Sequence, residues 1–248
     1  SCTISGNTAK ASDGSVKGGG VYIESGSFTM EDCTISGNTA GSETDNANAY
    51  GGGIFGASGT IIMNNTTISE NKVASVNGVE GAGVCLHGAN LTMNGGLISE
   101  NECSSDSSSF GGGVYVSDGT FSMEGDAVVD SSNDVYLKTG KTITISGKLT
   151  FNGSVATITP ENYAEVQVLA AGDKFTLSKE QVEKFNVTQS SEEFETTITS
   201  VGLKVGYLEN TLKDSSKLNE ALYEICSTII VTSADGMKEL SQLTGKTF

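Results

Sequence analysis

Few side chains in this sequence belong to the types that catalyse reactions or bind transition metals. The chain has one histidine, His87, and five cysteines, Cys2, Cys33, Cys85, Cys103 and Cys226. Structural zinc sites usually use closely spaced cysteine pairs, and the sequence contains no CxxC. In the repeat alignment, His87 shares a position with Glu24, Ala57 and Ser117, which we expect at an outward turn. We therefore predict no metal ion, no cofactor and no catalytic histidine.

Polysaccharide cleavage is the reaction that the remaining titratable residues could support. Lyases need a strong base beside calcium-binding acids, and glycosidases need two carboxylates at a set separation. The sequence contains no arginine, its lysines within the repeats lie in variable segments, and no pair of acids recurs. GxSxG nucleophile motifs and phosphate-binding glycine loops are absent as well. We expect a chain that is not an enzyme; the alternative is a polysaccharide lyase, a glycosidase or a sugar-binding module.

The balance of charges excludes two classes of partner. The 30 carboxylates and 14 lysines give a formal net charge of −16. Nucleic-acid binding depends on clustered basic residues, so we expect no nucleic-acid partner and repulsion from anionic membranes. The sequence has no run of 18 apolar residues, which predicts no direct membrane insertion. Loosely bound Ca²⁺ would suit this charge.

An internal repeat dominates the first half of the chain. The octet CTISGNTA at 2–9 returns unchanged at 33–40, and the string ISxN begins at Ile4, Ile35, Ile68 and Ile98. A glycine cluster follows each string, at 18–20, 51–53, 81–83 and 111–113. The unit is therefore about 30–33 residues long. Self-similarity at such a period is typical of a solenoid.

Apolar residues alternate with period two inside each unit, which indicates strands rather than helices. One inward column is predicted at Val21, Ile54, Val84, Val114 and Val135, and a second at Met30, Met63, Met93 and Met123. Stacked coils would pair such strands in parallel, about 4.8 Å apart. We therefore predict an all-β fold, a right-handed single-stranded parallel β-helix, with its hand set by the crossover preference.

Asparagine and cysteine columns are expected in the same stack. Asn7, Asn38, Asn71 and Asn101 end the four ISxN strings, where an amide side chain can bond to turn backbone and to its own copies above and below. We interpret them as a structural asparagine ladder. Cys2 and Cys33 share another column and are expected to pack as small apolar residues, with a disulfide between coils as the alternative.

Aromatic residues form a stripe opposite to the core columns. The stripe contains Tyr22, Phe55, Tyr115 and Tyr136, with Cys85 interrupting it. An exposed stripe would stack on sugar rings or contact a protein, so these four residues are a candidate ligand-contact surface. The alternative is that a turn or the variable segments fold over it.

The segments between ISxN and the glycines, at 8–17, 39–50, 72–80 and 102–110, vary in length and are polar. We predict them to be loops at one corner of the helix, where binding usually occurs. This arrangement predicts a stalk or adhesive scaffold that binds a host-surface protein or a glycan.

The paired motifs GGG-[V/I] and I-S-x-N resemble the GGA-[I/L/V] and FxxN repeats of the polymorphic outer-membrane protein family, over about residues 2–137. Isoleucine stands where that family has phenylalanine, and glycine mostly replaces its alanine. The resemblance implies a bacterial surface or secreted protein, extracellular or at the cell surface, with adhesive or display roles.

We predict three parts along the chain. Residues 1–148 form the β-helix repeats, residues 149–206 a last coil and β-rich cap, and residues 207–248 a small helix-strand-helix (α/β) segment leading into a following module. A solenoid end exposes core and strand edges, which is why a cap is expected. Because Ser1 stands inside a repeat, we expect the chain to be part of a longer multidomain protein.

Overall fold

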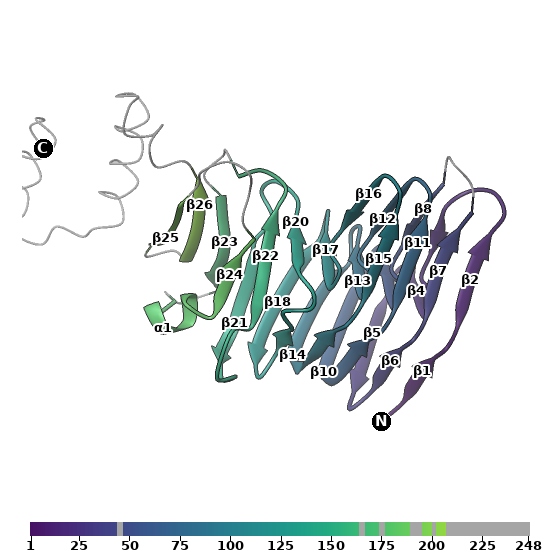
Figure 1. The fold of residues 1–248 in the computed structure, drawn as a ribbon. Helices are drawn as coiled ribbons and strands as arrows, with labels where there is room; N and C mark the ends of the chain where they lie inside the picture. The colour runs from purple at the N-terminus through teal and green to yellow at the C-terminus, as the bar shows by residue number, and fades with distance from the viewer. Residues whose placement is uncertain (44–46, 164–166, 174–176, 189–194, 200–201, 207–248) are drawn as a thin grey trace, which may run out of the picture. The chain divides into compact units, whose positions relative to one another are not determined.

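The computed structural model describes residues 1–43, 47–163, 167–173, 177–188, 195–199 and 202–206. It is a parallel β-solenoid of about six turns with almost no helix, which confirms the predicted fold class (Figure 1). The handedness remains a prediction from the crossover preference. All of the described residues belong to one compact unit, residues 1–206. The helix-strand-helix predicted for 207–248 lies outside the described residues.

Four sheets build the solenoid, and we name them A to D in the order in which the chain meets them. Sheet A contains β1 (Thr3–Ser5), β5 (Ser27–Glu31), β6 (Thr34–Ser36), β10 (Thr60–Ser69), β14 (Asn90–Ser99), β18 (Thr120–Gly125), β19 (Val128–Val129), β21 (Ile143–Leu149), β23 (Gln167–Gly172), β25 (Glu195–Thr199) and β26 (Gly202–Gly206). Sheet B contains β2 (Thr8–Ala11), β7 (Thr39–Ser42), β11 (Lys72–Ser75) and β15 (Glu102–Ser105). Sheet C contains β3 (Val16–Lys17), β8 (Asn48–Tyr50), β12 (Gly78–Glu80) and β16 (Ser108–Phe110). Sheet D contains β4 (Val21–Ile23), β9 (Ile54–Gly56), β13 (Val84–Leu86), β17 (Val114–Val116), β20 (Val135–Leu137), β22 (Ala156–Pro160) and β24 (Phe185–Val187).

The chain passes through the sheets in the order A, B, C and D and then returns to A. In one coil this path runs through β6, β7, β8, β9 and the start of β10. Each strand pairs in parallel with its counterparts in the coils before and after it, so that Met63 lies beside Met30 and Met93. The repeat therefore stacks each position on its own copies.

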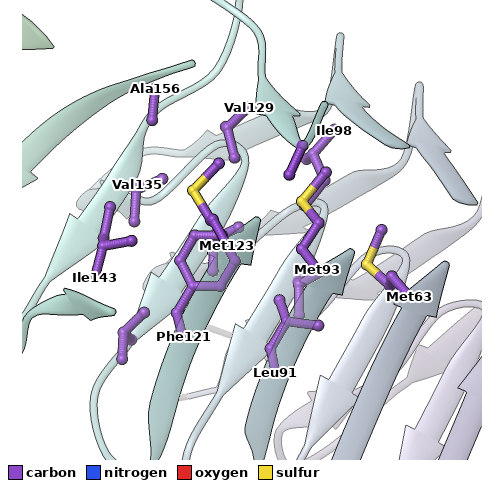
Figure 2. Packing of buried hydrophobic residues seen from close by; sticks show 14 of the residues in the cluster. Met63, Leu91, Met93, Ile98, Phe121, Met123, Val129, Val135, Ile143 and Ala156 are labelled. Carbon is purple, nitrogen blue, oxygen red and sulfur yellow. The ribbon is translucent and has the colours of Figure 1, made fainter. Parts of the chain in front are cut away.

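The main core lies between sheets A and D and follows the predicted columns. Met30, Met63, Met93 and Met123 are 0–3% exposed and in register, which confirms that these four methionines form one buried stack. Figure 2 shows Met63, Met93 and Met123 in this stack. The valine and isoleucine column of sheet D faces them in the same cluster. Alternation along each strand sends the intervening residues to the outer face.

The variable segments were predicted to be loops, and the described part of them corrects that prediction. Residues 8–11, 39–42, 72–75 and 102–105 form sheet B, and residues 16–17, 48–50, 78–80 and 108–110 form sheet C. The two sheets enclose a second small core that includes Ala40, Val73, Ala49 and Val79. Its residues are mostly small, so their alternation with polar residues looked like loop sequence. Segments of two to five residues, at 12–15, 43–47, 76–77 and 106–107, join sheet B to sheet C.

The glycine clusters form the corner between sheets C and D. Gly51 has a φ of +63°, a left-handed conformation that favours glycine. A Cβ on Gly53 would lie 2.6 Å from the carbonyl oxygen of Gly83 in the next coil. The corner therefore needs glycine both for its bend and for the close approach of neighbouring coils.

The stacked sheets continue past the boundary expected at residue 148. β21 spans that boundary, and β22 and β24 extend sheet D in parallel. At the end of sheet A, β26 pairs antiparallel with β23, and β25 pairs antiparallel with β26. These two strands therefore cover the edge of the last parallel strand, β23. The one described helix, α1 (Lys179–Val182), begins after the N-cap Ser178.

Candidate functional site

The asparagine ladder exists and is longer than predicted. The side-chain Nδ2 of Asn7, Asn38 and Asn71 each donates to the Oδ1 of the next member at 2.9 Å. The Nδ2 of Asn101 donates to the Oδ1 of Asn133 at 3.0 Å, so a fifth residue joins the four predicted ones. Sequence reasoning missed Asn133 because its coil has lost the ISxN string.

Each buried amide in the ladder has its polar atoms bonded. The Oδ1 of Asn71 accepts from the backbone N–H and the Nδ2 of Asn38, and its own Nδ2 also donates to the carbonyl of Ile35. Asn38 and Asn71 are 0% exposed. No donor or acceptor of these two side chains is left for a ligand, which agrees with a structural role.

The aromatic stripe is mostly covered. Phe55, Tyr115 and Tyr136 are only 1–8% exposed and form a separate cluster with Cys85, while Tyr22 is 49% exposed. Only Tyr22 is therefore exposed enough to contact a ligand. Phe55, Tyr115 and Tyr136 are covered by the variable segments, as the alternative prediction had it. The sequence could not show this because the cover comes from another sheet.

The covering residues are the last residues of the sheet C strands. Lys17, Tyr50, Glu80 and Phe110 are in register with one another across β3, β8, β12 and β16. Phe110 packs on Tyr136 with ring centroids 4.8 Å apart, and Tyr50 lies 5.9 Å from Phe55. We call the space between these residues and the stripe the outer corner.

One end of the outer corner is open. The ring of Tyr22 stacks on Phe55 with centroids 5.6 Å apart and an interplanar angle of 1°. The Nζ of Lys17 lies 5.3 Å from the centre of the Phe55 ring, which is a cation–π contact. Tyr22 therefore presents an exposed aromatic face beside a positive charge.

Three side chains with donor atoms for a metal meet in the middle of the outer corner. Glu80 ends β12, Cys85 is the central residue of β13, and His87 follows β13 directly. One ligand atom of each lies within 4.8 Å of the other two. The Nε2 of His87 is 2.8 Å from the Oε2 of Glu80.

The surroundings of these three residues are aromatic and poorly hydrated. The His87 ring contacts Tyr50 and Phe55 edge-on, both with centroid distances of 5.0 Å, and Tyr115 at 6.2 Å. Cys85 is 0% exposed, whereas the side chains of Glu80 and His87 are 22% and 31% exposed. Solvent therefore reaches the carboxylate and the imidazole but not the thiol.

Burial raises the pKa of two groups in the outer corner, Cys85 and Tyr115. Loss of hydration raises the pKa of the Cys85 thiol well above its usual value, and the charge of Glu80 acts in the same direction. Burial, followed by the charge of Glu80 and a hydrogen bond to it, also raises the pKa of Tyr115. Both groups therefore stay protonated at neutral pH in the protein alone.

The sequence analysis placed His87 at an outward turn and predicted no metal site. His87 does follow the strand at the outer face, but it is half-buried against Tyr50 and Phe55. The spacing Cys85-Leu86-His87 is the signal that could have indicated a site. Glu80 gave no signal, because it reaches the others only across the glycine corner.

The other described cysteines form no disulfide bond. Cys2, Cys33 and Cys103 are free thiols, so the alternative of a disulfide between Cys2 and Cys33 is not found in the structure. Cys33 packs at the edge of the main core, as expected for a small apolar residue, but Cys2 is exposed because no coil precedes it in the described stack.

Comparisons with protein-family models, characterised proteins and solved structures find no match to this chain. The resemblance to polymorphic outer-membrane proteins therefore depends on the repeat motifs alone. Among the described residues, no helix has the length and apolar character needed to cross a bilayer.

Proposed function

We propose that the chain is a non-catalytic scaffold segment of a bacterial surface or secreted protein, with binding as its role. The observation that carries this proposal is the contrast between constant and variable positions. The core columns and the asparagine ladder repeat from coil to coil, while the outward residues of sheets B and C differ between most neighbouring coils. A constant frame with a variable face is how a repeat protein changes its ligand without changing its fold.

The expected ligands are a host-surface protein or a glycan, and the contacts would be polar. Outward positions of sheet B, for example, carry Thr39, Lys72 and Glu102 in register. Such contacts are individually weak, and repetition along a longer protein would strengthen them through multivalency.

Shortening one turn tests this proposal. The segment 43–47 between β7 and β8 would be reduced to the two residues that join β11 and β12, at 76–77. The variant and the parent would be applied to a glycan array and to immobilised extracellular-matrix proteins, with circular dichroism to check folding. We expect a folded variant with altered binding. A parent that binds nothing on either array would contradict the proposal.

A sugar-binding module is the second candidate, and Tyr22 is the observation in its favour. Its exposed ring, backed by Phe55 and flanked by Lys17, is a platform on which a sugar ring could stack. Tyr22→Ala should then abolish glycan binding while Tyr22→Phe retains it. Phe151→Ala is the matched control, because Phe151 is also exposed, at 41%, and lies elsewhere.

A further inference from the structure

We propose that Glu80, Cys85 and His87 bind one divalent transition-metal ion of the Zn²⁺ type, with an open fourth position for water. This inference is independent of the proposed adhesive function. It depends on the convergence of the three donors, on the position of Glu80 and Cys85 between aromatic residues of the neighbouring coils, and on charge.

The donor atoms of Glu80, Cys85 and His87 converge on one point of the outer corner. The three donor atoms lie within 4.8 Å of one another. Ligand atoms around a tetrahedral zinc ion lie roughly 3.3–3.8 Å apart, as follows from bond lengths of about 2.0–2.3 Å. The 2.8 Å contact between His87 and Glu80 would therefore open by about 0.5 Å, and the widest separation would close by about 1 Å. The partly exposed side chains of Glu80 and His87 can make these movements. Cys85 stays fixed by its strand.

The backbone holds the three positions in place. Glu80 is paired in register with Tyr50 and Phe110, and Cys85 with Phe55 and Tyr115. The backbone N–H of His87 donates to the carbonyl of Gly56 at 3.0 Å. A binding site on paired strands is more precisely placed than one on a loop.

Glu80 and Cys85 each stand where the coils on both sides carry an aromatic residue. Glu80 has Tyr50 and Phe110 in the coils on either side, and Cys85 has Phe55 and Tyr115. A packing cluster would continue most simply with further rings. Instead, a carboxylate, a thiol and the single histidine of the chain occur together, between aromatic walls.

The charge and the chemistry of these donors suit a divalent transition-metal ion. A thiolate and a carboxylate together neutralise a divalent ion, so the loaded site would carry no net charge in poorly hydrated surroundings. On binding, the Cys85 thiol releases its proton to solvent, and the sulfur and the imidazole each donate an electron pair to the metal. One sulfur, one nitrogen and one oxygen favour Zn²⁺ or Co²⁺ over Ca²⁺ or Mg²⁺. Tyr115 interacts with Glu80 and would orient this ligand from behind.

Cobalt titration of the full chain tests the site directly. The protein would be stripped with a chelator, kept reduced, and titrated with Co²⁺ while the thiolate-to-cobalt charge-transfer band in the near ultraviolet is recorded. We expect one equivalent of Co²⁺ to produce the band and one equivalent of Zn²⁺ to remove it. Ca²⁺ should not compete. Absence of the band in the folded parent would overturn the proposal.

Variants assign the ligands. Cys85→Ser should abolish the band, and His87→Gln should weaken Co²⁺ binding at least about tenfold. Cys33→Ser and Cys103→Ser are matched controls that should keep it, because neither sulfur is in the cluster. A band that survives Cys85→Ser in folded protein would overturn the proposal. If Cys85→Ser does not fold, His87→Gln decides, since His87 is partly exposed and its replacement leaves the core intact: unchanged affinity in that variant contradicts the site.

Discussion

Single residues in the ladder carry several hydrogen bonds each, so their loss should be costly. Asn71 is fully buried and serves as partner to Asn38, Ile35 and Asn101. In Asn71→Ala these groups lose their partners inside the protein, and each unsatisfied buried group costs about 1–3 kcal/mol. We expect a loss of about 3 kcal/mol or more in the free energy of unfolding, measured by urea denaturation. Asn94→Ala is the control: Asn94 is half-buried and bonds through its side chain to Asn64, so its loss should be clearly smaller.

Strained residues stand directly before the ladder. The x position of ISxN adopts a left-handed conformation, with φ of +63° at Gly37 and +56° at both Glu70 and Glu100. The ladder asparagines themselves do not adopt this left-handed conformation. A non-glycine residue in this region costs roughly 1–2 kcal/mol, and part of that is offset by the higher chain entropy of glycine.

Glu70→Gly should therefore stabilise the protein by up to about 1 kcal/mol. Glu70 is exposed, so little else is lost. Thermal and urea denaturation would measure the change, and Glu70→Ala is the control that removes the charge but keeps the Cβ. Equal stability of the two variants would show that strain at this position is not the cause.

Buried acids predict a loss of stability at alkaline pH. Burial raises the pKa of Cys103 from 9.0 to about 12 and that of Tyr136 from 10.0 to about 12. Between these values the unfolded chain releases protons that the folded protein keeps, so the free energy of unfolding falls as pH rises from 9 towards 12. Below pH 9 both groups are mostly protonated in the folded and the unfolded chain, so they do not make the free energy of unfolding depend on pH.

Cys103→Val removes the titrating thiol and should therefore make this alkaline slope shallower. Valine is the chosen replacement because it occupies the same column at Val73. Urea denaturation at intervals from pH 7 to 11, under reducing conditions, would measure it. The flat region below pH 9 serves as an internal control. Parent and variant slopes that coincide above pH 9 would contradict the assignment.

The central strands of sheet A have one face in the main core and one outside, and the assignment of faces can be tested on β10. Met63 is 0% exposed between Met30 and Met93 (Figure 2), whereas its neighbour Ile62 points to the opposite face and is half-buried. Met63→Asp places an unpaired charge in the core and should cost more than about 4 kcal/mol, enough to unfold the central coils. Ile62→Asp should cost much less. Equal melting temperatures of the two variants would show the faces to be wrongly assigned.

Sheets B and C show how an element can depend on its neighbours. Each contributes only two to four residues per coil, too few for an isolated strand. They are ordered because every copy pairs with another copy and both sheets close over a small shared core. The same arrangement brings Tyr50 and Glu80 over the aromatic stripe.

At the scale of the whole molecule, the acidic charge bears on catalysis. With a net charge of −16 and no arginine, the protein would repel pectin and alginate and lacks the usual base of the lyases that cleave them. We expect no new unsaturated or reducing ends when the chain is incubated with such polymers, with and without Ca²⁺. Cleavage that disappears in Glu80→Gln, or in another single carboxylate or lysine variant, would instead support the carbohydrate-active enzyme.

The sequence by itself determined the stack. Because Ile35, Met63 and Asn71 each recur at one position of the repeat, pairing like with like was the only register that buries every copy, and the structure has that register. What depended on contacts between different sheets could not be predicted in this way. The small alternating residues of sheets B and C looked like loops, and the cover over Phe55, Tyr115 and Tyr136 comes from strands across the glycine corner. The meeting of Glu80 with Cys85 and His87 was decided by the bend at 81–83, because repeat spacing specifies which residues stack between coils but not which ones face each other within a coil.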